Sequence, residues 1–145
     1  MFFNTEFLDN LTVRAKSNPR LGQAYDLRTS PNENSQRMLN ALEPGTIMPI
    51  HRHRNTSETM VMVRGALIER FYSLTPDPSP ESEGKMIPVL TQEFEMCAGG
   101  ECLVVQIEAG QWHSLEVLES GTIIFEAKDG RYEPLGEEDI LTIHD

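Results

Sequence analysis

Cysteine is scarce in this chain. Its 145 residues contain two, Cys97 and Cys102. They are not arranged as the C-x-x-C of redox and zinc motifs. On a single strand, an odd offset would also place them on opposite faces. We therefore predict two reduced residues rather than a disulfide, and a chain of this length can be held together by its core alone.

Positive charge is also in short supply, with 12 Lys and Arg against 23 Asp and Glu and a net charge of −11. This balance argues against nucleic-acid backbones and anionic membranes as partners, because both require basic patches. No apolar run approaches the ~20 residues of a membrane span. The first ten residues have no basic segment before an apolar stretch, so they do not resemble a secretory signal. We expect a cytoplasmic protein whose partner is a small molecule.

The composition predicts one globular domain over residues 1–145, because 39% of the residues are hydrophobic and 24% are charged. We divide it into an N-terminal extension (1–35), a β-barrel core (36–127) and a C-terminal tail (128–145). The extension begins with a predicted helix over 4–16, which Asn4 or Thr5 would cap.

The rest of the chain favours β-structure. An arm and loop are expected over 20–35, and a Pro-, Ser- and acid-rich loop over 75–85. Short apolar or alternating runs punctuated by glycines are typical of a barrel or sandwich. The predicted strands are 36–42, 46–53, 59–63, 66–74, 86–95, 101–108 and 121–127, with a further strand opening at His113.

The stretch from Gly45 to Gly65 holds the clearest functional signal. His51 and His53 are two residues apart, so on one strand end they project to the same face. A turn after them would bring Glu58 back toward the two imidazoles. Two imidazoles and a carboxylate at one point predict a metal site.

This stretch resembles the first signature motif of the cupin superfamily. The motif runs Gly, five residues, His-x-His, four residues, Glu, six residues, Gly, and the chain matches it at every defined position. The resemblance implies an all-β fold, the cupin double-stranded β-helix or jelly-roll barrel, here with a short N-terminal helical extension.

His113 is the candidate fourth ligand, after a glycine turn at Gly110. The segment resembles the second cupin motif, P-x-G-x-x-H, although Glu108 replaces its proline and its final asparagine is absent. Three imidazoles and one carboxylate suit one divalent ion, Zn, Fe, Mn or Ni. His144, close to the C-terminus, is not expected to be a ligand.

A closer resemblance is to the WbuC-like cupin-fold metalloproteins. It rests on S-N-P-R (17–20), S-Q-R-M-L-N-A-L-x-P-G-T (35–46), P-x-H-R-H (49–53) and S-E-T (57–59). These bacterial proteins are often encoded near polysaccharide biosynthesis genes. The resemblance implies a bound metal and a homodimer.

Two residues outside the ligand set are candidate substrate-binding groups. Arg37 carries a planar fork that suits a carboxylate or phosphate, although a salt bridge would equally explain it. Tyr25 could add a hydroxyl group. Trp112 alternates with His113 along the chain, so we expect it to pack on the opposite face.

Two functions remain open at this point. The first is a metal-dependent isomerase, lyase or oxygenase acting on a small sugar-derived or carboxylated metabolite. The second is a non-catalytic metal-containing module that binds a small ligand, which the lack of an identifiable acid–base pair favours. The complete first motif argues against a metal-free barrel and against the metal-free epimerases of this fold.

Overall fold

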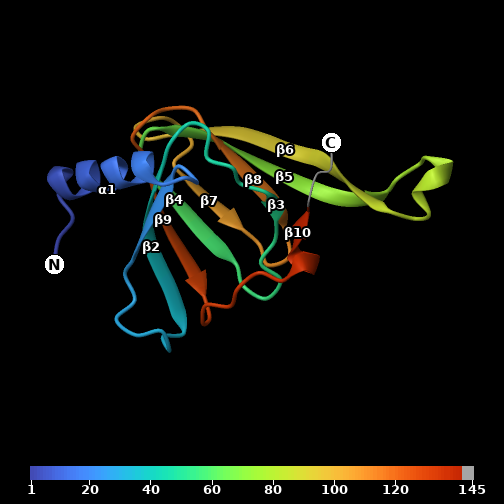
Figure 1. Cartoon of the computed structure of the whole chain (residues 1–145), viewed down its shortest axis with the longest axis horizontal. Coiled ribbons are helices and arrows are strands. Elements are labelled where there is room, and N and C mark those ends of the chain that lie inside the picture. Colours follow the sequence, from blue (N-terminus) through green and yellow to red (C-terminus); the bar gives the residue numbers. More distant parts are fainter. Residues whose placement is uncertain (142–145) are drawn as a thin grey trace.

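The computed structural model describes residues 1–141, which form two antiparallel five-stranded sheets and one long helix (Figure 1). The first sheet has the strand order β1-β2-β9-β4-β7, and the second has the order β10-β3-β8-β5-β6. Neighbouring strands are often distant in sequence, as in a jelly roll. The predicted all-β fold with a helical extension is confirmed.

The strands of the first sheet are β1 (Gly22–Asp26), β2 (Ser35–Leu42), β9 (Thr122–Asp129), β4 (Glu58–Arg64) and β7 (Val104–Ile107). Those of the second sheet are β10 (Ile140–Leu141), β3 (Ile50–His51), β8 (Trp112–Val117), β5 (Ala66–Pro76) and β6 (Met86–Cys97). Short 3-10 turns lie at η1 (Pro80–Ser82) and η2 (Glu137–Asp139).

Helix α1 (Thr5–Ser17) lies on the outer face of the first sheet (Figure 1). The Asn4 side chain accepts a hydrogen bond from the backbone N–H of Phe7 and so caps the helix, as predicted. Leu8, Leu11 and Ala15 are its buried residues, and they join an apolar cluster with residues of β2 and β9. Among the described residues, no helix has the length and apolar character needed to cross a membrane.

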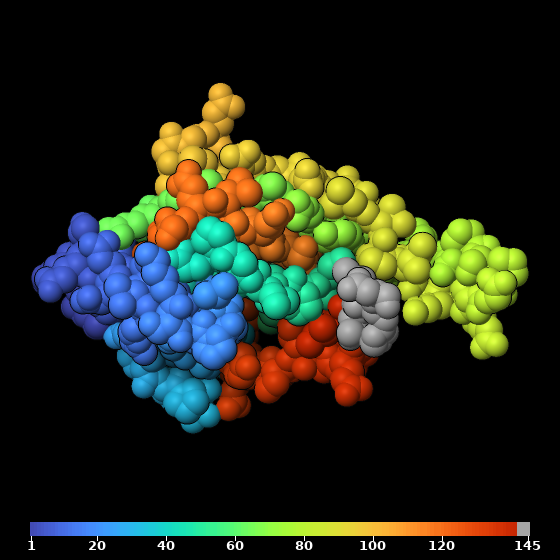
Figure 2. Space-filling view, turned by 45° about the horizontal axis from the view of Figure 1, so that its top comes forward, coloured from blue at the N-terminus to red at the C-terminus, as the bar shows by residue number. Residues whose placement is uncertain are grey.

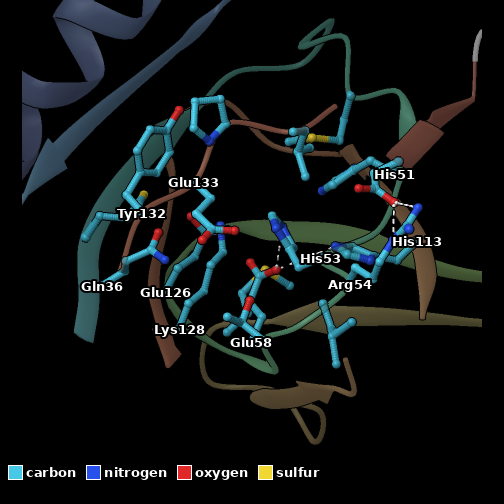
Figure 3. Close-up of a pocket in the computed structure, with 18 of the residues that line it drawn as sticks. Gln36, His51, His53, Arg54, Glu58, His113, Glu126, Lys128, Tyr132 and Glu133 are labelled. Atoms are coloured by element: carbon cyan, nitrogen blue, oxygen red, sulfur yellow. Dashed lines mark hydrogen bonds and ion pairs between the residues drawn. The ribbon is translucent and has the colours of Figure 1, made fainter. Parts of the chain in front are cut away.

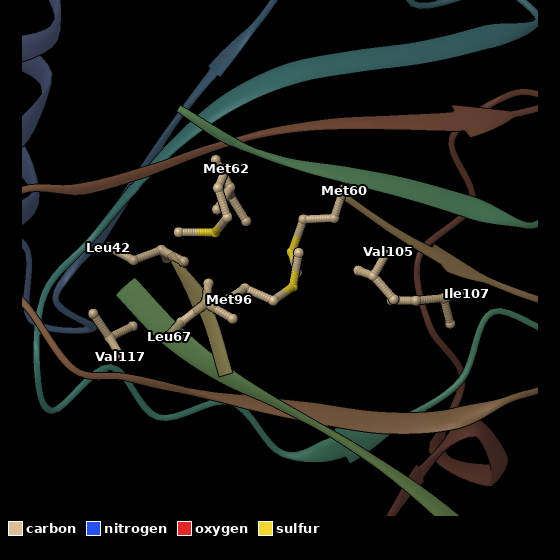
Figure 4. Close-up of a cluster of buried hydrophobic side chains, with 9 residues drawn as sticks. Leu42, Met60, Met62, Leu67, Met96, Val105, Ile107 and Val117 are labelled. Atoms are coloured by element: carbon tan, nitrogen blue, oxygen red, sulfur yellow. The ribbon is translucent and has the colours of Figure 1, made fainter. Parts of the chain in front are cut away.

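The main core lies between the two sheets and is rich in methionine (Figure 4). Residues two apart on a strand share a face, so β4 supplies Met60 and Met62 to this core and β7 supplies Val105 and Ile107. The members of this core are Leu42, Met60, Met62, Leu67, Met96, Val105, Ile107, Val117 and Ile124. This apolar cluster fills part of the barrel and leaves the remaining interior to the polar residues described below.

Strands β5 and β6 form a long hairpin whose tip extends beyond the body of the molecule (Figures 1 and 2). The connection between the strands falls within the predicted 75–85 loop and includes η1. The hairpin shifts register between Phe71 and Tyr72. A bulge of this kind bends the strand and increases its local twist.

Three predictions about the strands need correction. The strand predicted over 46–53 shortens to β3, because Pro49 has no N–H to donate to a ladder. The arm over 20–35 contains β1, and the tail contains β10. The two cysteines are free thiols, as predicted, and the Cys97 N–H donates to the Cys102 carbonyl over 3.2 Å across a turn.

Gly65 occupies the tight turn between β4 and β5, and its missing side chain is a structural requirement. Its φ is +78°, and a Cβ there would lie 2.7 Å from the Thr122 Cα. Gly121 has a similar φ of +81°, but a Cβ there would meet nothing within 4 Å. A side chain at either position would have a strained positive φ, but only a side chain at Gly65 would also clash with the neighbouring backbone.

We predict that Gly65→Ala lowers the free energy of unfolding by about 3 kcal/mol, the sum of backbone strain and overpacking. Gly121→Ala should cost only about 1 kcal/mol, because it introduces backbone strain alone. Urea denaturation of both variants measures the difference. Equal losses would contradict the close approach to Thr122.

Candidate metal centre

Three histidines converge at one end of the barrel (Figure 3). His51 of β3 is the ladder partner of His113 of β8, and His53 follows two residues after His51. One ring nitrogen from each histidine lies within 4.8 Å of the other two. The chain therefore brings together the three histidines that the two motifs predict.

Backbone carbonyls orient two of the imidazoles. The Nδ1 of His51 is 2.9 Å from the Pro49 carbonyl, and the Nδ1 of His113 is 2.9 Å from the Gln111 carbonyl. A carbonyl only accepts, so each Nδ1 carries the proton in these bonds. The Nε2 of both rings is left with a free lone pair, which is the arrangement found in metal-ligating histidines.

Glu58, at the start of β4, completes the cluster. The Glu58 side chain is buried, and its Oε2 lies 3.5 Å from the Nε2 of His53 and 3.5 Å from the Nε2 of His113. Within residues 1–141 this oxygen has no hydrogen-bond partner. A buried carboxylate oxygen without a partner is costly, and a cation held with the imidazoles would satisfy it.

Burial also keeps the imidazoles ready to bind. Desolvation, helped by the charge of His113, lowers the pKa of His51 to about 4. Desolvation, helped by the charge of Lys128, lowers the pKa of His53 to about 4. Both rings are therefore neutral at physiological pH, as a metal ligand must be. The donor set, the orphaned carboxylate oxygen and the protonation states fit one divalent metal ion.

Glu126 and Lys128 of β9 lie beside Glu58 (Figure 3). Burial raises the pKa of Glu58, but its interaction with His113 and the charge of Lys128 outweigh burial, so the net pKa is lowered. Burial and the negative charge of Glu58 raise the pKa of Glu126 to about 8. The two adjacent carboxyl groups therefore differ in state at neutral pH, with Glu58 ionised and Glu126 protonated.

A third carboxyl group, Glu69 of β5, lines the same cavity. It is 1% exposed, and neither carboxyl oxygen has a hydrogen-bond partner in the described part of the chain. Burial, followed by the charges of Glu58 and Glu126, raises the pKa of Glu69 to about 9. At neutral pH this side chain is therefore a neutral carboxylic acid.

The segment before β10 passes along the mouth of the site and is tied to the chain that carries His51 and His53. Asp139 accepts hydrogen bonds from Arg52 over 2.8 Å and from Arg54 over 2.9 Å. Arg52 also lies over the Trp112 ring at 4.7 Å. Trp112 therefore packs on the face opposite His113, as predicted, and the arginines beside the ligand histidines have structural partners.

The cavity has a volume of about 1000 Å³. Its wall includes Asn40, Glu69, Glu126 and Lys128, to which the sequence motifs assigned no role. The sequence feature that could have identified them is a polar or charged residue at an inward-facing position of an otherwise apolar strand. An example is T-I-I-F-E-A-K-D of β9.

The predicted substrate-binding residues lie elsewhere. Arg37 faces away from the cavity and forms an ion pair with Glu33 at 2.6 Å. Tyr25 packs edge-on against Phe3 and Phe7 under the N-terminal helix. Neither residue lines the cavity of the histidines, so a ligand that touched them would sit outside it. His144 lies outside the described residues.

Solved structures share this fold at low sequence identity. The structure of KdgF from Halomonas sp. has a TM-score of 0.55 at 13% identity, with 79% of this chain and 84% of that chain covered. The capsular polysaccharide assembling protein CapF from Staphylococcus aureus has a TM-score of 0.53 at 22% identity, covering 81% and 30%. Oxalate decarboxylase from Bacillus subtilis, a protein with Mn(II) centres, has a TM-score of 0.52 at 20% identity, covering 84% and 28%.

These likenesses define a cupin jelly-roll fold, and the chain spans less than a third of CapF and of oxalate decarboxylase. No curated protein sequence matches the chain. A family model described as a domain of unknown function (DUF6016) matches residues 3–76. The chain belongs to this family, and the match includes the first histidine motif.

We predict that Glu69→Gln stabilises the metal-free protein increasingly as pH rises. A group with a raised pKa contributes stability that is present below its unfolded pKa and is lost as pH rises toward its folded pKa. The wild type therefore loses stability between pH 4.5 and about 9 relative to the variant. Between pH 6 and 8 the gap in unfolding free energy should grow by about 3 kcal/mol.

Urea denaturation at the two pH values in EDTA measures this gap. Glu43→Gln is the matched control, because Glu43 is a buried acid whose oxygens accept from Ser120 and Gly121. A pH-independent gap for Glu69→Gln would show that Glu69 is ionised in the folded protein.

Proposed function

We propose that the protein is a metal-binding cupin that binds a small sugar-derived or carboxylated metabolite at its metal centre. His51, His53, Glu58 and His113 would hold the ion. The observation that carries this proposal is the orphaned Glu58 Oε2 placed 3.5 Å from two Nε2 atoms. When bound, the metal supplies a Lewis acid with coordination positions left open for a ligand oxygen.

Lys128 supports an anionic ligand. It extends from β9 and lines the cavity of the histidines beside Glu58 and Glu126 (Figure 3). Its positive charge acts on His53, Glu58 and Glu126. In a chain of net charge −11 this local cation, beside a metal, would attract a carboxylate.

The second candidate function is a non-catalytic binding module. It is favoured by the protonation states of the cavity acids, since burial raises the pKa of Glu69 to about 9 and that of Glu126 to about 8. Protonated carboxyl groups are poor general bases at neutral pH but good hydrogen-bonding groups. Isomerase, lyase or oxygenase chemistry remains the catalytic alternative.

We also infer a role connected with polysaccharide biosynthesis and assembly as a homodimer. The support is the motif resemblance to WbuC-like proteins, and CapF, one of the proteins with this fold, is a capsular polysaccharide assembling protein. A mass measurement by light scattering tests the dimer, and a monomeric mass at micromolar concentration would contradict it.

The metal assignment is tested by elemental analysis of protein purified without a metal-affinity column. We expect about one divalent ion per wild-type chain. His51→Ala and His53→Ala should each reduce the metal content sharply, because each removes one donor from a single site. The fold should survive, since the apolar core is separate from the site.

His144→Ala is the histidine control and should retain the wild-type metal content. Equal metal in the wild type and in both ligand variants would contradict the assigned ligands.

Catalysis and binding are separated by prolonged incubation of the metal-loaded protein with D-glucuronate, followed by proton NMR. An unchanged, bound sugar acid is the result expected for the binding module. Metal-dependent conversion that is absent in His51→Ala would instead establish the enzyme.

A further inference from the structure

Two buried side chains between the core and the metal centre carry oxygen atoms without a hydrogen-bond partner in the described residues. Glu69 of β5 has both carboxyl oxygens unpaired, and Asn40 of β2 has its Oδ1 unpaired, within the described residues. Their side chains are 1% and 6% exposed. Each such group costs about 1–3 kcal/mol in the folded state, so the pair requires an explanation.

The strand pattern places both groups at the bottom of the cavity. Two residues along β5 from Glu69 is Leu67, and two residues along β2 from Asn40 is Leu42. Both leucines belong to the apolar core. Glu69 and Asn40 therefore form the boundary between the core and the cavity, from opposite sheets, and we call this pair the floor.

The floor suits hydroxyl groups. A protonated carboxyl group offers one donor and free acceptor positions, and the Asn40 Oδ1 offers an acceptor. A ligand hydroxyl both donates and accepts, so the hydroxyl groups of a ligand can satisfy each of the two residues. An anionic group is disfavoured there, because the two floor residues are buried and neither carries a positive charge to offset its desolvation.

The opposite end of the cavity has the complementary character. Lys128 lies two residues along β9 from Glu126, and its register partners are Gln36 and Glu58. With the three histidines, it forms a positively charged level above the floor once a metal is bound. A ligand that matches both levels has a carboxylate at one end and hydroxyl groups at the other.

We propose that Glu69 and Asn40 are a hydroxyl-binding subsite, and that the ligand is a polyhydroxylated carboxylate of the sugar-acid class. This inference rests on the proposed function, because it takes the carboxylate end to be held at the metal level. It assigns a specificity role to two residues outside the metal-ligand motifs.

The test compares two carboxylates of similar shape by calorimetry on the zinc-loaded protein. D-Glucuronate carries ring hydroxyls, whereas cyclohexanecarboxylate carries none. Wild type should bind D-glucuronate at least ten-fold more tightly, since one good hydrogen bond is worth about that factor. Glu69→Leu should lose this preference by weakening D-glucuronate alone, and Glu69→Gln should retain most of it.

A stability measurement separates this role from a structural one. Replacing an unpaired buried acid with leucine removes a desolvation cost, so Glu69→Leu should raise Tm while lowering D-glucuronate affinity. Glu43→Leu is the matched control and should change Tm in the opposite direction. Glu43 is equally buried but is fully partnered, so this variant should lower Tm and leave both ligand affinities unchanged.

Three other results would overturn the inference. Equal affinity of wild type for the two carboxylates would contradict the hydroxyl subsite but would still agree with a carboxylate bound at the metal. An unchanged preference in Glu69→Leu and Asn40→Leu would mean that the floor is filled by water alone. Binding of neither carboxylate to zinc-loaded wild type would contradict the proposed function itself.

Discussion

The ladder pair between His51 of β3 and His113 of β8 joins the two halves of the site. The residues are 62 positions apart in the chain, and only antiparallel pairing brings them together. Backbone carbonyls two residues before each histidine then set the tautomer. The pairing of the strands therefore determines how the rings are oriented, and the ring orientation determines which nitrogen can bind a metal. A shift of one residue in the register between β3 and β8 would turn an imidazole out of the barrel.

The barrel interior is divided between two kinds of chemistry. Strands β2, β4, β5 and β9 each contribute both apolar and polar side chains to the inward face. The apolar part supplies stability, while the polar part holds groups that the free protein leaves unsatisfied. Because these groups lie at one end of a well-packed barrel, the apolar core can offset the folding free energy that they cost. The surrounding strands also hold them in fixed positions for a bound ion or ligand.

The clustering of the three histidines and Glu58 was predictable because the spacing of these residues is local and specific. His51, His53 and Glu58 fall within eight residues, and His113 follows a glycine turn. The cavity acids were not predictable in the same way. Glu69 and Glu126 belong to no local motif, and only the pairing of distant strands shows that both face the same cavity as Glu58.

The helix cap at Asn4 could be predicted from the sequence because capping is a local interaction. Strands β1 and β10 were missed because their pairing partners, rather than their own composition, define them as strands. For Arg37 and Tyr25, the side-chain chemistry suggested a contact with a ligand. Both residues lie on strand faces that point away from the cavity, and this orientation was not evident from the sequence.

Trp112 is the single tryptophan of the chain, and its position has a practical consequence. Its indole adjoins the ligand His113 in sequence and lies under the guanidinium of Arg52, which Asp139 holds from the C-terminal segment. Indole emission depends on nearby charge and on ring contacts. The molecule therefore carries an intrinsic fluorescent reporter at the junction of the metal centre and the segment along its mouth, and both can be observed optically without a label.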